Sequence, residues 1–148
     1  MSESRNVEVL KEYLGALQVS DGEKMASLLA PDLRYWVSPG SDFSGDHDKA
    51  SLLALLPAIF GVQAGPEKLI YREITAQENR VSVVADGTMP LKSGGNYDQT
   101  YHWLFKFRDD KIVEILEYID ILQVWKAFGT PEQKAIAKAS TESKSKTV

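Results

Sequence analysis

The first candidate for chemistry is Asp120, a carboxylate placed between two apolar runs, Ile112–Ile119 and Leu122–Phe128. A carboxylate held beside aromatic rings is poorly solvated, which raises its pKa toward values that suit proton transfer. The alternative is that Asp120 only caps a short helix beginning at Ile121. The two interpretations differ in the direction of the side chain, and catalysis requires that it face an apolar interior.

Asp86 is the candidate for the second carboxylate of an acid/base pair. It shares a strand face with Ser82 and Val84, and two carboxyls in different environments can divide the roles of proton acceptor and donor. A solvent-facing aspartate ahead of Gly87, in a turn or bulge, explains the pattern equally well.

The aromatic residues are numerous enough to wall a cavity for a flat apolar molecule, although most of them are expected to fill the core. Tyr101 could donate a hydrogen bond to a developing oxyanion, but core packing with a satisfied hydroxyl is the stronger interpretation. Trp36 and Trp103 are the predicted cavity walls. The predicted substrate-binding residues are Trp36, Trp103, Tyr35, Tyr118 and Ser38.

The two histidines are weaker candidates. Strand phase places His102 on the face opposite Trp103, and only a β-bulge would turn it inward, so it is a reserve candidate. His47 lies between two aspartates, but three adjacent ligands converge poorly on one ion, and a helix-capping loop is the better interpretation. The chain contains no phosphate-binding Gly-rich loop, Ser-His-Asp spacing or nucleotide fingerprint, so we predict no cofactor and no metal.

These candidates must be positioned by a β-hairpin near the end of the chain. Aromatic residues occupy every second position from Tyr101 to Phe107, while Lys106 and Arg108 alternate with them and require water. Arg108–Lys111 is a polar turn, and the β-branched run that follows predicts an antiparallel partner strand.

The rest of the chain predicts helices first and strands after them. The apolar spacing predicts a helix that starts at Asn6 as its N-cap, and a second, short helix capped by Asp21. A third helix is capped by Asp46 or Asp48, and Pro57 should kink it or end it early. Strands are predicted at Leu33–Val37, Leu69–Gln77, Arg80–Thr88, Tyr97–Phe107 and Ile112–Ile119.

This order predicts an α+β fold in one domain, residues 1–129, followed by a C-terminal tail at 130–148. The tail loses its large apolar residues, so we expect a short helix over Pro131–Ala139 and a mobile end.

Composition narrows the classes of function. A net charge of −4 without a clustered basic face argues against nucleic acid. The absence of cysteine excludes disulfides, a thiolate nucleophile and a cysteine metal site. No signal-peptide core and no apolar run of membrane-spanning length is present, so we expect a cytoplasmic protein without a membrane partner.

The segment Tyr97–Gly129 resembles the SnoaL-like group, which contains ketosteroid-isomerase and polyketide-cyclase relatives within the nuclear-transport-factor-2-like superfamily. Its pattern is Y-x-N-x-Y-x-F-x-F-x-F-x-D-G-K-I, then R-E-Y-x-D and an aromatic-Gly pair. The matching residues are Tyr97, Tyr101, Phe105, Phe107, Asp110, Lys111, Ile112, Glu117, Tyr118, Asp120 and Gly129. Gln99 replaces the usual Asn and the turn lacks its Gly. The resemblance covers residues Val7 to Gly129.

The resemblance implies a curved antiparallel sheet wrapped over three N-terminal helices, forming a cone with a pocket inside. It places Asp120 at that pocket as an acid or base, and it favours Asp86 as a second cavity carboxylate. It also implies a homodimer built across the outer sheet face, where we expect Ile115 and Ile119.

Two departures from relatives limit the reaction. Ketosteroid isomerases carry their proton-shuttling aspartate directly before a proline, where this chain has Ser38, so steroid isomerisation by that route is not expected. Related epoxide hydrolases use an Asp-Arg-Asp arrangement. Here Arg80 and Asp120 match, Ser82 replaces the first aspartate, and Asp86 is too far along the strand to substitute.

The sequence therefore predicts cofactor-free acid/base catalysis of the isomerase, cyclase or lyase type, on a hydrophobic cyclic or aromatic small molecule. The competing hypothesis is a module of the same fold that binds a ligand or assembles without chemistry.

Overall fold

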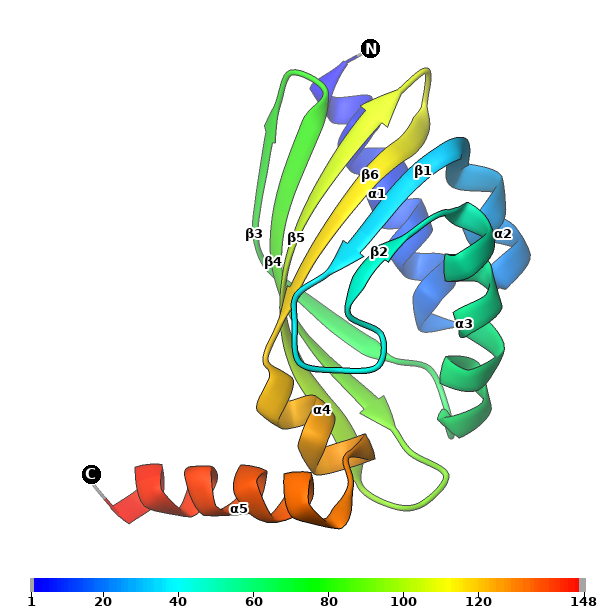
Figure 1. The fold of residues 1–148 in the computed structure, drawn as a ribbon. Helices are drawn as coiled ribbons and strands as arrows, with labels where there is room; N and C mark the ends of the chain where they lie inside the picture. The colour runs from blue at the N-terminus through cyan, green and yellow to red at the C-terminus, as the bar shows by residue number, and fades with distance from the viewer. Residues whose placement is uncertain (1, 147–148) are drawn as a thin grey trace.

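The computed structural model describes residues 2–146, and the side chains of residues 2–140 (Figure 1). Its elements are α1 (Glu3–Gln18), α2 (Gly22–Leu28), β1 (Leu29–Val37), β2 (Gly45–His47), α3 (Lys49–Val62), β3 (Lys68–Gln77), β4 (Arg80–Pro90), β5 (Asn96–Arg108), β6 (Lys111–Ile119), α4 (Ile121–Phe128) and α5 (Pro131–Lys146).

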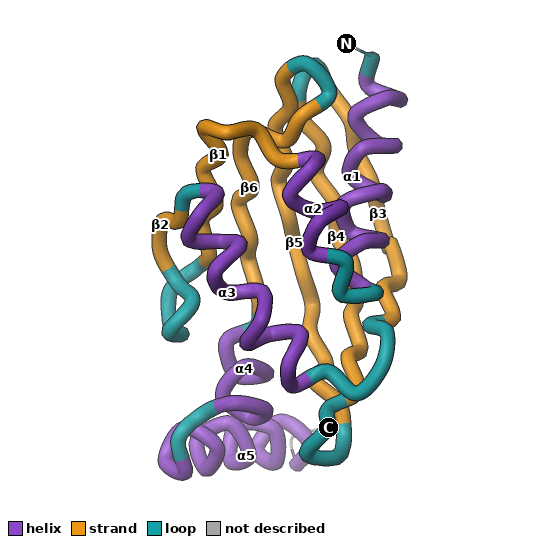
Figure 2. The backbone as a smooth tube through the Cα atoms, turned by 90° about the vertical axis from the view of Figure 1, so that its right-hand side faces the viewer, coloured by secondary structure: helices purple, strands orange, loops and turns teal. Residues whose placement is uncertain are grey.

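The strands form one curved, unclosed sheet in the order β2-β1-β6-β5-β4-β3. All neighbouring pairs are antiparallel except β1 and β6, which run parallel. The helices α1, α2 and α3 cover one face of this sheet, while α4 and α5 lie at its lower end (Figures 1 and 2). The predicted α+β architecture is confirmed.

The core lies between the three helices and the sheet face that they cover. Helix α1 buries one stripe that includes Leu10 and Leu14, as its three-to-four-residue apolar spacing predicts. Strands β4 and β5 contribute every second residue, so that Val83, Trp103 and Phe105 are each at most 2% exposed. The predicted inward row on β5 is therefore confirmed.

The hairpin between β5 and β6 contains an irregularity that determines which face of the sheet the later side chains of β6 occupy. Asp109 and Asp110 form its two-residue turn with φ of 50° and 60°, a conformation that aspartate tolerates without glycine. The register then shifts between Lys106 and Phe107, so that β6 contains one residue more than its partner over this stretch. Beyond this β-bulge, Trp103 lies opposite Glu117.

The bulge corrects the predicted faces of β6. A one-residue shift in pairing moves a whole set of side chains to the other face of a sheet. Ile115 is only 2% exposed and belongs to the core, and Ile119 packs against the core, so their predicted place on the outer face is wrong. Leu116 and Tyr118 take the outer face instead.

The local predictions have mixed outcomes. The predicted N-cap of α1 is wrong: the cap is Ser2, whose side chain accepts a hydrogen bond from the Arg5 N–H, whereas Asn6 is buried inside the helix. Asp48, one of the two predicted caps, does cap α3, and Pro57 lies within that helix without ending it. The segment after β1, where no strand was predicted, contains the short strand β2, which pairs with β1.

The C-terminal region begins at Gly129, where close packing requires glycine. A Cβ added there would lie 2.5 Å from the Trp125 carbonyl oxygen. Helix α5 runs to Lys146, further than the expected Ala139, and extends away from the sheet (Figure 1). The mobile end stays a prediction, since residues 147 and 148 lie outside the described residues. Within residues 2–146, no helix is both long and apolar enough to cross a membrane.

Candidate functional site

A cavity of about 250 Å³ lies between the helices and the inner face of the sheet. Aliphatic and aromatic side chains from α1, α3 and the strands form most of its wall. The lining residues with polar side-chain atoms are Tyr13, Tyr35, Glu67, Tyr97, Tyr101, Trp103 and Glu117. Among the described residues, no lysine, arginine or histidine lines this cavity. Two carboxyls therefore share an apolar space that lacks a basic side chain.

Glu117 is the first of these carboxyls, and β6 directs it into the cavity. The indole N–H of Trp103 donates to Glu117 Oε1 at 2.8 Å, and the Tyr35 hydroxyl donates to Oε2 at 3.1 Å. Burial raises the pKa of Glu117, while the hydrogen bonds from Trp103 and Tyr35 and the nearby His47 oppose that rise. The hydrogen bonds thus fix the orientation of the carboxyl, and its raised pKa makes the carboxylate a stronger base, as general base catalysis requires.

Glu67 is the second carboxyl and lies just before β3. It is 7% exposed, and its Oε1 has no hydrogen-bond partner among the described residues. Its backbone is held on both sides by Gln18: the Glu67 N–H donates to the Gln18 carbonyl, and Gln18 Nε2 donates to the Glu67 carbonyl, each at 2.9 Å. Burial, with a smaller contribution from the charge of Glu117, raises the pKa of Glu67 to about 7.

Gly87 makes the space that Glu67 occupies. A Cβ at this position would lie 2.8 Å from Tyr101 Cε2 and 3.1 Å from Glu67 Oε1. Any larger residue would push the tyrosine ring or the carboxyl out of its place. The absence of a side chain on β4 at this point is therefore part of the construction of the site.

The tyrosines supply hydroxyl groups beside the carboxyls. Tyr101 stacks on Trp103 with ring centroids 4.2 Å apart, and Gln99 Nε2 donates to the Tyr97 hydroxyl at 2.7 Å. Burial raises the pKa of both tyrosines, so their hydroxyls keep their protons at neutral pH. They can donate hydrogen bonds to a ligand oxygen that gains negative charge.

Asp120 does not face the cavity, and the prediction that it does is wrong. Its side chain is exposed and caps α4, with Oδ1 accepting from the Leu122 N–H at 3.0 Å. Its backbone N–H and carbonyl are both bound by the Gln99 side chain, at 2.8 and 3.1 Å. The β-bulge is the physical reason: without it Trp103 would face the strand phase that ends at Asp120, and with it Trp103 faces Glu117.

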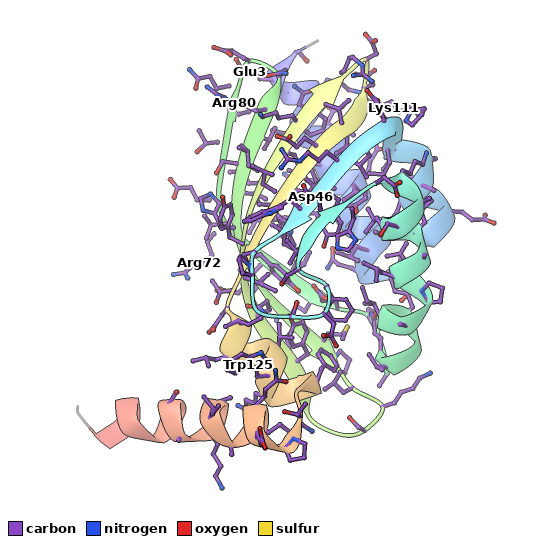
Figure 3. The ribbon with its side chains drawn as sticks, in the orientation of Figure 1. Glu3, Asp46, Arg72, Arg80, Lys111 and Trp125 are labelled. Atoms are coloured by element: carbon purple, nitrogen blue, oxygen red, sulfur yellow. The ribbon has the colours of Figure 1, made fainter. Side chains whose placement is uncertain are left out.

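Asp86 also lies outside the cavity. It is on the outer face of β4, where its side chain is 45% exposed and forms an ion pair of 3.7 Å with Arg72. Figure 3 shows Arg72 projecting from the side of the sheet away from the helices. The inward positions of β4 belong to Val83, Ala85 and Gly87. The expected pairing of Asp86 with Asp120 in one site therefore has no geometric basis.

Of the other predicted residues, Tyr101, Trp103 and Tyr35 line the cavity. Trp36 and Tyr118 do not line it and instead pack against each other on the outer face, with ring centroids 5.2 Å apart. Ser38 supports β6, because its hydroxyl accepts the Ile119 N–H at 3.3 Å.

The histidines are both engaged elsewhere. His102 Nε2 and the Ser82 hydroxyl are 2.8 Å apart on the outer face, the side expected for His102. His47 Nε2 lies 2.7 Å from the Phe43 carbonyl oxygen, and its Nδ1 lies 2.8 Å from the Ser51 hydroxyl. These contacts fix the segment that places Phe43 in the cavity wall. Among the described side chains, those of residues 2–140, no three of His, Asp or Glu are grouped as a metal site requires.

The prediction missed both cavity carboxyls. Glu117 was matched to the family pattern, but its inward direction depends on the bulge, which no sequence pattern marked. Glu67 follows Pro66 and precedes the predicted strand Leu69–Gln77, and a single glutamate there carries no signal of burial. Gly87, read only as a turn or bulge residue, was the available indication that something approaches β4 closely.

A curved sheet over three helices, with an apolar cavity between them, defines a cone-shaped member of the nuclear-transport-factor-2-like superfamily. The SnoaL-like domain family matches residues 10–115, and the chain belongs to this family. No curated protein sequence matches the chain.

Solved structures support the same assignment. An NTF2-like protein from Burkholderia xenovorans LB400 is 27% identical with a TM-score of 0.68, covering 86% of this chain and 98% of its own. A putative isomerase from Bacillus subtilis (19% identical, TM-score 0.74, 88% and 98% covered) has the same fold. So does an LEH-like epoxide hydrolase from M. tuberculosis (18% identical, TM-score 0.67, 83% and 88% covered).

Proposed function

We propose that the chain is a cofactor-free acid/base enzyme acting on a hydrophobic cyclic or aromatic small molecule, with Glu117 as the proton-transfer group. The observation that carries this proposal is the place of Glu117: a half-buried carboxyl that lines an apolar cavity and is oriented by the Trp103 indole and the Tyr35 hydroxyl. Solved structures of this fold described as a putative isomerase and an epoxide hydrolase are consistent with chemistry in such a cavity.

The step that this geometry supports is removal of a proton from carbon next to a carbonyl. The Glu117 carboxylate takes the proton, and the C–H electron pair moves into the adjacent bond and onto the carbonyl oxygen. The hydroxyl of Tyr101 or Tyr97 donates to that oxygen as its charge grows. Return of the proton at another carbon gives isomerisation, and departure of a group from the neighbouring carbon gives elimination. Each carboxylate oxygen retains a lone pair for the proton despite its existing hydrogen bond.

Deuterium exchange into β-tetralone tests this proposal without knowledge of the natural substrate. The acidic carbon next to its carbonyl exchanges in heavy water, and NMR follows the loss of the proton signal. We expect the wild-type protein to accelerate exchange, and Glu117→Gln to lower the catalysed rate by about 100-fold or more. Asp120→Asn is the matched control, since it changes an exposed carboxyl outside the cavity. Equal rates for wild type and Glu117→Gln would contradict the proposal.

A binding module without chemistry is the alternative function. Both Glu117 oxygens already accept hydrogen bonds, and Ser38 stands where ketosteroid isomerases have their base. This alternative predicts that β-tetralone binds, as shown by chemical-shift changes of cavity residues, while its exchange rate remains that of buffer.

We also propose a homodimer that pairs the outer sheet faces. Leu104, Leu116, Tyr118 and Trp36 lie on this face, although a sheet face in contact with water normally carries polar side chains. Sedimentation of wild type and Leu104→Lys tests this assembly. The variant should become monomeric, and a wild-type protein that sediments as a monomer would contradict it.

A further inference from the structure

We infer that the cavity selects a ligand that carries a protonated amino group beside its ring, and that Glu67 is the anionic partner of that group. This inference rests on the proposed function, because it assigns the substrate class of the same cavity. Glu117 would perform the proton transfer and Glu67 would anchor the ligand.

The first observation is the unpartnered oxygen of Glu67. Buried polar groups in proteins are nearly always hydrogen-bonded, and a buried carboxylate requires a cationic or donor partner. Glu67 lines the cavity and is set in place by its two backbone contacts with Gln18. Its Oε1 is covered, lies close to Gly87 and has no such partner among the described residues. A position so well fixed, with its binding capacity unused, indicates a partner that arrives with the ligand.

The second observation is the charge of the cavity. The two glutamates are its acidic groups, and no basic side chain among the described residues lines it. The charge of Glu117 disfavours ionisation of Glu67, and a cation placed between them would favour the charged form of both. A ligand anion would be repelled by the two carboxylates and would disfavour their charged forms. The cavity is thus built to accept positive charge and to reject negative charge.

The third observation is the aromatic wall around the carboxyls. Tyr101 lies close enough to Glu67 that Gly87 must leave room for both, and its ring stacks on Trp103. Ring faces of Tyr and Trp attract ammonium groups, so a ring face that the Tyr101–Trp103 stack leaves uncovered would add to the attraction of the carboxylate. Such a combination of acid and rings is the way proteins recognise organic ammonium ions.

The volume of the cavity limits the size of the ligand's apolar skeleton. An apolar protein cavity of about 150 Å³ can bind benzene. The present cavity of about 250 Å³ therefore admits a fused two-ring skeleton with one small substituent. A neutral ligand whose carbonyl accepts a hydrogen bond from protonated Glu67 is the competing occupant, and the test below separates the two.

The experiment compares three probes built on the same indane skeleton and substituted at the same carbon: aminoindane, indanol and indane carboxylate. Binding is measured by titration calorimetry at about pH 8, where an alkyl ammonium is charged and Glu67 is ionised. We expect the amine to bind at least about ten-fold more tightly than the alcohol, because a hydrogen bond between charged groups is stronger than one to a neutral donor. The carboxylate should show no binding.

Glu67→Gln should lower the affinity for the amine by about ten-fold or more and that for the alcohol by less than about two-fold. Retained alcohol binding shows that the variant is folded. Glu73→Gln is the matched control, since it removes the same charge from β3 at an exposed position outside the cavity. This variant should bind both probes like the wild type.

Three results would overturn the inference: no measurable amine binding, an alcohol that binds as tightly as the amine, or equal losses of amine affinity in Glu67→Gln and Glu73→Gln. Preference for the alcohol would assign the cavity to neutral ligands. Amine binding that fails while Glu117-dependent exchange of β-tetralone persists removes this inference alone. Amine binding that depends on Glu67 without any catalysed exchange removes the proposed reaction alone.

Discussion

Trp103 and Glu117 lie directly opposite each other on β5 and β6, and the indole N–H donates to Glu117 Oε1 at 2.8 Å. This pair joins the aromatic wall of the cavity to its base. Cross-strand neighbours share a sheet face, so the inward row of β5 places the glutamate inside as soon as the register is known. The same hydrogen bond fixes the orientation of the carboxyl and opposes the effect of burial on its pKa.

Replacement of Trp103 by phenylalanine should shift the pH dependence of exchange to higher pH. The variant keeps an aromatic ring but loses the N–H that stabilises the charged carboxylate, so the pKa of Glu117 should rise further. The pH profile of β-tetralone exchange checks this. A lower rate with an unchanged pH midpoint would instead indicate that the indole only shapes the cavity.

The stability of the protein should fall as the pH rises from about 4.5 to about 7, in part because of Glu67. Its folded-state pKa is raised, so the folded state binds more protons than the unfolded state in this window, and the free energy of unfolding decreases with pH. The rise in the pKa of Glu67 from 4.5 to about 7 lowers the free energy of unfolding by about 3 kcal/mol at pH values above this window. The charge of Glu117 on β6 acts on Glu67, and because the pKa of Glu117 is itself raised, Glu117 contributes a slope of the same sign. Tyr97 and Tyr101 on β5 stay protonated in this window, because burial and the charge of Glu67 raise their pKa.

Urea unfolding of wild type and Glu67→Gln at several pH values measures this effect. The two proteins should have similar stability at about pH 4, and the variant should be the more stable by up to about 3 kcal/mol at about pH 8. Glu73→Gln, at its exposed position, should follow the wild type. A variant that loses stability equally at both pH values would show that Glu67 acts through packing.

The sequence predicted the N-terminal helices, the long strands in their order along the chain and the inward row of β5, because these follow from apolar periodicity repeated over many residues. It did not predict the inward carboxyls. A hairpin without a bulge would pair Phe105 with Glu114 and turn Glu117 outward, which agrees with the predicted outer-face positions of Ile115 and Ile119. The structure instead pairs Phe105 with Ile115. The single unpaired residue Val113 therefore determines which side chains of β6 face the cavity.

Glu67 could not be predicted for a different reason. Its burial results from contacts between segments distant in the sequence: Gln18 on α1 binds its backbone, and Gly87 on β4 leaves space for its side chain. No local pattern encodes such an arrangement. Strand phase did place Tyr101 and Trp103 correctly, since both belong to a row whose direction the neighbouring Lys106 and Arg108 determine.

Replacement of Gly87 by alanine should disturb the cavity more than its single methyl group suggests. The new Cβ would lie 2.8 Å from the Tyr101 ring and 3.1 Å from Glu67 Oε1, so one of these groups must move. We expect a loss of about 1–3 kcal/mol of stability and weaker binding of aminoindane. Gly15→Ala is the control, because no other atom lies within 4 Å of the added Cβ and the position is inside α1. It should increase stability by about 0.5–1 kcal/mol. Equal effects of the two variants would contradict the close packing at Gly87.

Asp120 should contribute to stability rather than to catalysis. Asp120→Ala removes the side chain that caps α4 and should cost about 1 kcal/mol, whereas Asp120→Asn keeps a capping acceptor and should cost a few tenths or less. Neither change should alter the exchange of β-tetralone, because the side chain is exposed and does not line the cavity. Thermal unfolding and the exchange assay on both variants separate the two roles. If Asp120→Asn abolished exchange while leaving stability unchanged, the catalytic carboxyl would be the one that ends β6, and the assignment to Glu117 would have to be withdrawn.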